Sequence, residues 1–428
     1  MAARTRTTRR LVRTVGAAAL VATVLAAGAN ARETASPRAA AEPGRCVWSA
    51  YGGAAGRSFT PPCPPPRGAG HLRPRARFFR PTGAAVAAAP VVDGATAFAG
   101  DWAGRVRAVD LRSGSVRWTF DAGARIVTSA TLAELARERL LVVASRGTVH
   151  AVRASDGVPV WRRRLGEHVR IESSPAVARG LALVGSSAGV WALRVRDGAV
   201  AWRFRRSVRT TPTVDLRRGA AYVGTADAIV ALDLDTGRVR WSSRPQAAAP
   251  RLGFTGKATL LRGRHGIPLV GLGSADGCYY AVDARSGRVV WRRHVADVGP
   301  RGGAAGGLLA PAARGGGRLY VTSAAGRGPY LTALDAGTGH IAWRSSDAGP
   351  SFAPPVVLGR VVITAEAGGV LRGVDTATGR TIWWSATRRP LTGGAAVAGS
   401  WLVAGTGFQI DGAAERDPAN GIVAYRLR

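Results

Sequence analysis

Two carboxylates and one lysine are placed where they could do chemistry. Glu172 comes just before an apolar run in RIESSPAV, Asp101 follows one in FAGDWAG, and Lys257 is the only lysine of the chain. Carboxylates at such positions can bind a cation or act as a general base, and a lysine can contact a polar group of a substrate. We favour plainer roles, namely an ion pair between Glu172 and Arg170 and a structural turn at Asp101. We expect Lys257 to lie on the surface.

The remaining candidate motifs lack the context that their chemistry needs. The six histidines show no metal-ligand spacing. GSSAG at residues 185–189 fits the G-x-S-x-G pattern of serine hydrolases, but that pattern needs a strand-to-helix turn and this segment is expected to be a hairpin. Cys46, Cys63 and Cys278 match neither haem attachment nor a zinc site. The sequence therefore identifies no catalytic residue and no metal ligand.

The N-terminus has the pattern of an export signal. Arginines precede an apolar run from Val15 to Ala29, and Ala29-Asn30-Ala31 forms an A-x-A cleavage pattern. We expect a signal peptide over 1–31 and a disordered linker over 32–45, with an uncleaved membrane anchor as the alternative. Export predicts a secreted or extracytoplasmic protein in an oxidising compartment, where Cys46 and Cys63 could form a disulfide.

The chain is strongly basic, with 60 lysines and arginines against 26 aspartates and glutamates and a net charge of +34 over 428 residues. The arginines are spread over the chain and no nucleic-acid-binding motif accompanies them. We therefore expect a solvated basic surface and no sequence-specific nucleic acid partner. Binding of an anionic polymer through this surface is a further possibility.

A single segment recurs seven times and supplies the elements that must position these side chains. Two of the copies are VRAVDLRSGSVRW and IVALDLDTGRVRW. Successive copies among the seven are separated by 39 to 52 residues. A glycine precedes each final tryptophan by four residues, and a small residue precedes it by ten. The tryptophans are Trp118, Trp161, Trp202, Trp241, Trp291, Trp343 and Trp383, and the glycines are Gly114, Gly157, Gly198, Gly237, Gly287, Gly339 and Gly379. This period is typical of propeller blades.

Two further short strands between successive hairpins complete a blade of four antiparallel strands. GIVAYRLR at the C-terminus starts an eighth hairpin, whose tryptophan would fall after the last residue. Since a propeller must close its ring, we predict an all-β, eight-bladed propeller over 46–428, with 46–80 supplying the closing strand of the last blade. We expect Trp48 to complete that blade and the Cys46–Cys63 disulfide to hold the closing strand.

The repeat resembles the pyrroloquinoline quinone (PQQ) repeat, A-x-D-x-x-T-G-x-x-x-W, over residues 46–428. The resemblance implies an eight-bladed propeller in which the tryptophans pack between neighbouring blades. Three stretches, CVWSAYGGAAGRSF among them, look closest to the polyvinyl-alcohol dehydrogenase branch. Dehydrogenases of this family hold PQQ and Ca²⁺ in a central funnel, so the resemblance implies cofactor-binding roles for Glu172, Lys257 and Asp101 if the chain is a quinoprotein.

The chain departs from that family's cofactor site. Asn420 is the only asparagine after the signal peptide, and no adjacent pair of cysteines is present. GSADG stands where the polyvinyl-alcohol branch has a lysine in a G-x-K-x-G turn. We therefore expect no cofactor and a non-catalytic, monomeric scaffold of the cell envelope that binds a protein, peptide or glycan at the funnel face. The alternative is a PQQ- and Ca²⁺-dependent alcohol oxidoreductase that passes electrons to a separate acceptor.

Overall fold

The structure of the protein is a computed structural model. It describes residues 46–54, 56, 59–61, 63, 73–245, 253–298, 308, 310–324, 326–387, 389–407 and 417–427. The chain divides into two units, Met1–Gly44 and Arg45–Arg428, and all described residues belong to the second. The expected signal peptide and the 32–45 linker lie outside them. No helix within the described ranges is long and apolar enough to cross a membrane.

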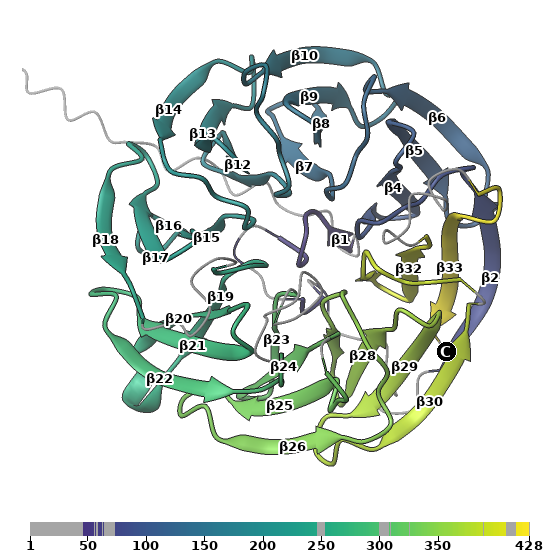
Figure 1. Cartoon of the computed structure of the whole chain (residues 1–428). Coiled ribbons are helices and arrows are strands. Elements are labelled where there is room, and N and C mark those ends of the chain that lie inside the picture. Colours follow the sequence, from purple (N-terminus) through teal and green to yellow (C-terminus); the bar gives the residue numbers. More distant parts are fainter. Residues whose placement is uncertain are drawn as a thin grey trace, which may run out of the picture. The chain divides into compact units, whose positions relative to one another are not determined.

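Residues 46–427 form eight antiparallel sheets arranged around a ring (Figure 1). Blade 1 consists of β3 (Val91–Asp93), β4 (Thr96–Gly100), β5 (Arg105–Asp110) and β6 (Val116–Asp121), and blade 2 of β7 (Thr131–Glu134), β8 (Arg139–Ser145), β9 (Thr148–Arg153) and β10 (Pro159–Arg164). Blade 3 consists of β11 (Ala176–Ala178), β12 (Leu181–Ser186), β13 (Gly189–Arg194) and β14 (Val200–Phe204), and blade 4 of β15 (Thr213–Asp215), β16 (Ala220–Gly224), β17 (Ile229–Asp233) and β18 (Val239–Ser243). The first of these four strands lies on the inner side of each blade and the last lies on the rim (Figure 1); in blade 1 a further strand, β1 (Val47–Trp48), pairs with β3 on its inner side.

Blades 5 to 8 repeat this order. Blade 5 consists of β19 (Thr259–Arg262), β20 (Pro268–Gly273), β21 (Cys278–Asp283) and β22 (Val289–His294), and blade 6 of β23 (Ala313–Gly315), β24 (Arg318–Thr322), β25 (Leu331–Asp335) and β26 (Ile341–Ser345). Blade 7 consists of β27 (Val356–Leu358), β28 (Val361–Ala365), β29 (Val370–Asp375) and β30 (Thr381–Ala386), and blade 8 of β31 (Ala395–Ala398), β32 (Trp401–Gly405), β33 (Gly421–Leu427) and β2 (Pro74–Pro81). The predicted all-β, eight-bladed propeller with four antiparallel strands per blade is confirmed.

The alternation of strand direction places the connections on two opposite faces. Turns from the first to the second strand and from the third to the fourth lie on one face, which we call the A–B face. Turns from the second to the third strand lie on the other, together with the loops that lead to the next blade. We call this the B–C face. Because the loops between blades are the longest connections in most of the ring, the B–C face carries most of the irregular backbone.

The repeated tryptophan and glycine meet across the junction between two blades. A Cβ added to Gly237 of blade 4 would lie 2.3 Å from Cε3 of Trp202 in blade 3, so only glycine leaves room for this ring. Trp202 also donates its Nε1–H to the carbonyl oxygen of Leu234 at 3.0 Å. The glycine has φ +70, as the turn requires. The tryptophan of one blade therefore packs against the glycine turn of the next blade.

The ring closes with β2, which pairs with β33 as the outer strand of blade 8. Phe78 lies opposite Ala424 across a β-bulge, the place that tryptophan takes in the other blades. Its ring contacts Gly114 of blade 1, where an added Cβ would lie 3.0 Å from Cγ. The N-terminal stretch thus supplies the closing strand, as expected, but the aromatic side chain is phenylalanine.

The prediction that Trp48 completes blade 8 is wrong. β1 (Val47–Trp48) pairs with β3, and so adds a fifth, innermost strand to blade 1. Trp48 is fully buried there, among core residues of blades 7, 8 and 1. The search for a tryptophan led to the wrong segment because the closing strand carries phenylalanine at that position.

Candidate functional site

The centre of the propeller holds the chain's own N-terminal segment. We call residues 46–63 the N-terminal loop, of which 46–54, 56, 59–61 and 63 are described. Main-chain hydrogen bonds and one threonine side chain tie it to blades around the ring. The bonds are Gly94 N–H to Cys46 O (3.2 Å), Leu132 N–H to Ser49 O (2.7 Å), Val357 N–H to Phe59 O (2.9 Å) and Thr60 Oγ1–H to Arg314 O (2.6 Å). Partners in blades 1, 2, 7 and 6 place the loop at the axis, where β1 lies in Figure 1.

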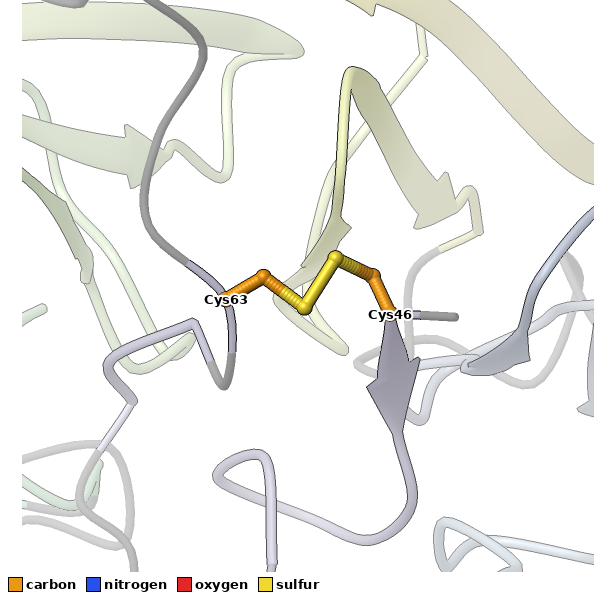
Figure 2. The surroundings of a disulfide bond; sticks show 2 residues. All are labelled: Cys46 and Cys63. Atoms are coloured by element: carbon orange, nitrogen blue, oxygen red, sulfur yellow. A yellow bond between two sulfur atoms is a disulfide. The ribbon is translucent and has the colours of Figure 1, made fainter. Parts of the chain in front are cut away.

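The disulfide between Cys46 and Cys63 closes this loop, which confirms the predicted pairing (Figure 2). Cys46 lies at the A–B face. Its carbonyl oxygen accepts the N–H of Gly94, and its Sγ is 3.9 Å from a Cβ added to Gly399. Both glycines lie in turns between the first and second strands, Gly94 in blade 1 and Gly399 in blade 8. Inside the loop, the rings of Tyr51 and Phe59 pack edge to face at 5.0 Å. The loop therefore places apolar side chains at the axis.

Lys257 binds the loop from the B–C side. It precedes β19, is 2% exposed, and donates from Nζ to the carbonyl oxygens of Tyr51 (2.8 Å) and Ala54 (2.9 Å). Burial lowers its pKa from 10.5 to about 7. The expectation of a surface lysine is wrong, because the N-terminal loop covers this position. The sequence around Lys257 could not have predicted this contact, because Tyr51 lies 206 residues away in the chain.

Asp101 lies in the turn between β4 and β5 and is 1% exposed. One carboxylate oxygen accepts the N–H of Arg105 at 3.0 Å, and the other forms an ion pair with Arg107. The adjacent Trp102 packs under the guanidinium of Arg125 at 4.3 Å from the ring centroid. Asp101 therefore holds its own turn together through both oxygens.

Glu172 lies in the loop before β11, at the B–C face. Its Oε2 accepts from Nε of Arg209 at 2.6 Å, so the partner is Arg209 of the next blade rather than the expected Arg170. Arg170 does not pair with Glu172, but both side chains line a cavity of about 230 Å³ together with Arg209. The expectation of an ion pair holds, but sequence proximity suggested the wrong arginine.

The sequence analysis missed a second buried carboxylate. Glu366, 4% exposed, lies in the turn between β28 and β29 and accepts two bonds from Arg372, at 2.7 Å from Nε and 3.2 Å from Nη2. This pair repeats the design of Asp101 and Arg107. An acidic residue just after an apolar strand with arginine six residues later is the pattern that could have identified both pairs.

A third buried carboxylate, Asp276, lies in the equivalent turn of blade 5. Its oxygens accept the Tyr280 hydroxyl at 2.6 Å and the Cys278 N–H at 2.9 Å. The free thiol of Cys278 is 1% exposed and accepts from Nε of Arg292 at 3.3 Å. Burial and the charge of Asp276 raise the pKa of this thiol, an effect that Arg292 opposes.

The described residues do not fit a Ca²⁺–quinone site. Calcium takes six to eight oxygen ligands that converge on one point. Asp101, Asp276 and Glu366 lie on blades 1, 5 and 7, and each is engaged by its own turn. No group of three or more His, Cys, Asp or Glu side chains in the described ranges could hold a metal ion. The N-terminal loop also occupies the axis.

A family profile described as outer membrane protein assembly factor BamB, which is built on PQQ-type repeats, matches residues 102–254 and 275–426. These two ranges make up more than half of the chain. The chain belongs to this family. It is 27% identical over 315 residues to outer membrane protein assembly factor BamB of Yersinia pestis, which covers 68% of this chain and 75% of that relative.

Solved structures of a BamB and of a quinohemoprotein alcohol dehydrogenase resemble this BamB-family propeller. BamB from Moraxella catarrhalis matches with a TM-score of 0.64 and 18% identity, over 82% of this chain and 97% of that one. Quinohemoprotein alcohol dehydrogenase from Comamonas testosteroni matches with a TM-score of 0.72 and 15% identity, over 89% and 80%. At these identities the likeness shows the fold alone.

Proposed function

We propose that this protein is a non-catalytic scaffold of the cell envelope, which works outside the cytoplasm, as a monomer and without a cofactor. The observation that carries the proposal is the N-terminal loop at the axis, where a quinoprotein would hold its cofactor. The N-terminal loop occupies this place, Lys257 binds it, and the nearby buried carboxylates are engaged by their own turns. Family membership and the disulfide support the envelope location.

The partner surface is the B–C face in this proposal. The long loops between blades lie there, and binding residues are commonly carried by loops on a rigid scaffold. His168 and Arg209 are exposed in two such loops. The partner is an envelope protein, or a peptide or glycan of the envelope, that these loops contact.

Site-specific photo-crosslinking in cells tests this assignment. A photoreactive residue at position 168 is expected to form adducts with envelope components, because its loop faces the partner. The same residue at Val239, which is 50% exposed on an outer strand, is the matched control and is expected to form few adducts. Equal yields at the two positions, or no adduct at position 168, would contradict the assignment of this face.

A further inference from the structure

The A–B face has a hollow beside the N-terminal loop. A cavity of about 670 Å³ lies between Ala54 and Gly56 of the loop and the inner strands of blades 3 to 5. A second cavity, of about 510 Å³, extends toward blade 6 and shares Gly56, Arg262 and Arg314 with the first. The two cavities therefore adjoin. Their volumes are those of sites that hold small molecules.

Arginine dominates the charged side chains that line the larger cavity. Five arginines line it, against one carboxylate, Asp215, which pairs with Arg218 at 2.7 Å. The other four have no ion pair in the part of the chain that the structure describes. They are Arg217, Arg262, Arg285 and Arg314. Five arginines against one carboxylate around a single hollow are a local excess of positive charge.

The N-terminal loop does not compensate this charge. Residues 46–63 contain no aspartate or glutamate. Arg262, at the end of β19, and Arg314, in β23, lie close enough to repel one another. Partial desolvation and the charge of Arg262 lower the pKa of Arg314. An anion between these two side chains would relieve the repulsion, and the concave wall would strengthen its attraction.

We propose that this arginine hollow binds a compact, soluble molecule that carries several phosphoryl groups. Guanidinium groups donate paired hydrogen bonds that match phosphate oxygens, and four of them suit an anion with several charges. A concave hollow of this size favours a small molecule over a flat lipid surface. The site goes beyond the proposed scaffold function and does not depend on it, because it lies on the opposite face.

Calorimetric titration of the purified mature protein with tripolyphosphate tests the proposal. Saturable binding is expected, with affinity that falls as salt is raised. The double variant Arg262→Gln/Arg314→Gln should bind at least about tenfold more weakly, since each lost partner removes a charge-assisted hydrogen bond. Both side chains are exposed, so the variant is expected to fold, and its melting temperature checks this.

A matched control separates the hollow from the general charge of the chain. Arg205→Gln/Arg380→Gln removes two exposed arginines from blades 3 and 7 and changes the net charge equally; it should bind tripolyphosphate as the unaltered protein does. Equal losses in the two double variants, or unchanged binding in the first, would overturn the proposal. So would binding to vesicles of anionic lipid that depends on Arg262 and Arg314 in the absence of tripolyphosphate binding.

Discussion

At the scale of single residues, Lys257 connects two segments that are distant in sequence. Its ammonium group satisfies two carbonyl oxygens of the N-terminal loop from a position that water does not reach. Removal from water disfavours the charged form of this group. Burial therefore lowers its pKa to about 7 in the folded chain, against an ordinary value of 10.5.

Replacement of Lys257 should change how stability depends on pH. Between about pH 7 and 10.5 the unfolded chain keeps the proton that the folded chain has lost, so the free energy of unfolding rises with pH. The slope from this group is on the order of 1.4 kcal/mol per pH unit at most. Lys257→Gln should lose that slope, as urea unfolding at pH 7, 8.5 and 10 would measure. Parallel curves for the two proteins would contradict this account.

Cys278 should behave as a packing residue. Burial and the charge of Asp276 raise the pKa of its thiol, so little reactive thiolate forms at neutral pH. We expect iodoacetamide to leave Cys278 unmodified in the native protein and to alkylate it in denaturant, as mass spectrometry of the intact chain would show. Rapid alkylation of the native protein would mean that the thiol is accessible.

At the scale of elements, the hairpin turn and the blade junction share one glycine. Gly237 needs its positive φ for the turn and its missing Cβ for Trp202. Gly180 has a similar φ of +71, but no atom lies within 4 Å of an added Cβ. An alanine at position 180 would therefore strain only the backbone, whereas an alanine at position 237 would also collide with the tryptophan ring.

Two alanine substitutions compare these requirements. Gly180→Ala should cost about 1–2 kcal/mol through the backbone alone. Gly237→Ala should cost about 1–3 kcal/mol more, because the new methyl group collides with the tryptophan. Chemical denaturation of both variants measures the difference. Equal losses would mean that the junction adapts to the extra methyl group.

The buried ion pair of Glu366 and Arg372 should be essential to its hairpin. Arg372→Met leaves a buried carboxylate without its partner, which should cost about 3–5 kcal/mol of unfolding free energy. Adding Glu366→Gln should recover part of the loss. Arg164→Met, at an exposed pair with Glu167, is the matched control and should cost less than about 1 kcal/mol. A small effect of Arg372→Met would show that water reaches Glu366.

At the scale of the whole molecule, the sequence predicted what repeats. Seven tryptophan–glycine pairs at fixed spacing and one incomplete copy predict eight blades, and the incomplete copy predicts closure by the N-terminal stretch. The disulfide was predicted from two cysteines in a chain with the pattern of an export signal. These features are local or periodic, so a single sequence carries them.

The features that the sequence analysis missed depend on contacts between distant segments. Phe78 replaces tryptophan at the closing junction, which left Trp48 as the only visible candidate. Lys257 is buried by a loop from the other end of the chain. Glu172 takes its partner from the next blade. None of these contacts has a signature in the spacing of nearby residues.

The central claim is that the N-terminal loop, rather than a cofactor, occupies the axis of the propeller. Equilibrium dialysis of the purified protein against PQQ with Ca²⁺, followed by an assay of alcohol-dependent dye reduction, tests it most directly. An alcohol dehydrogenase reconstituted in parallel controls for the cofactor. We predict no saturable binding and no dye reduction. Binding of one PQQ per chain with alcohol-dependent reduction would contradict the account.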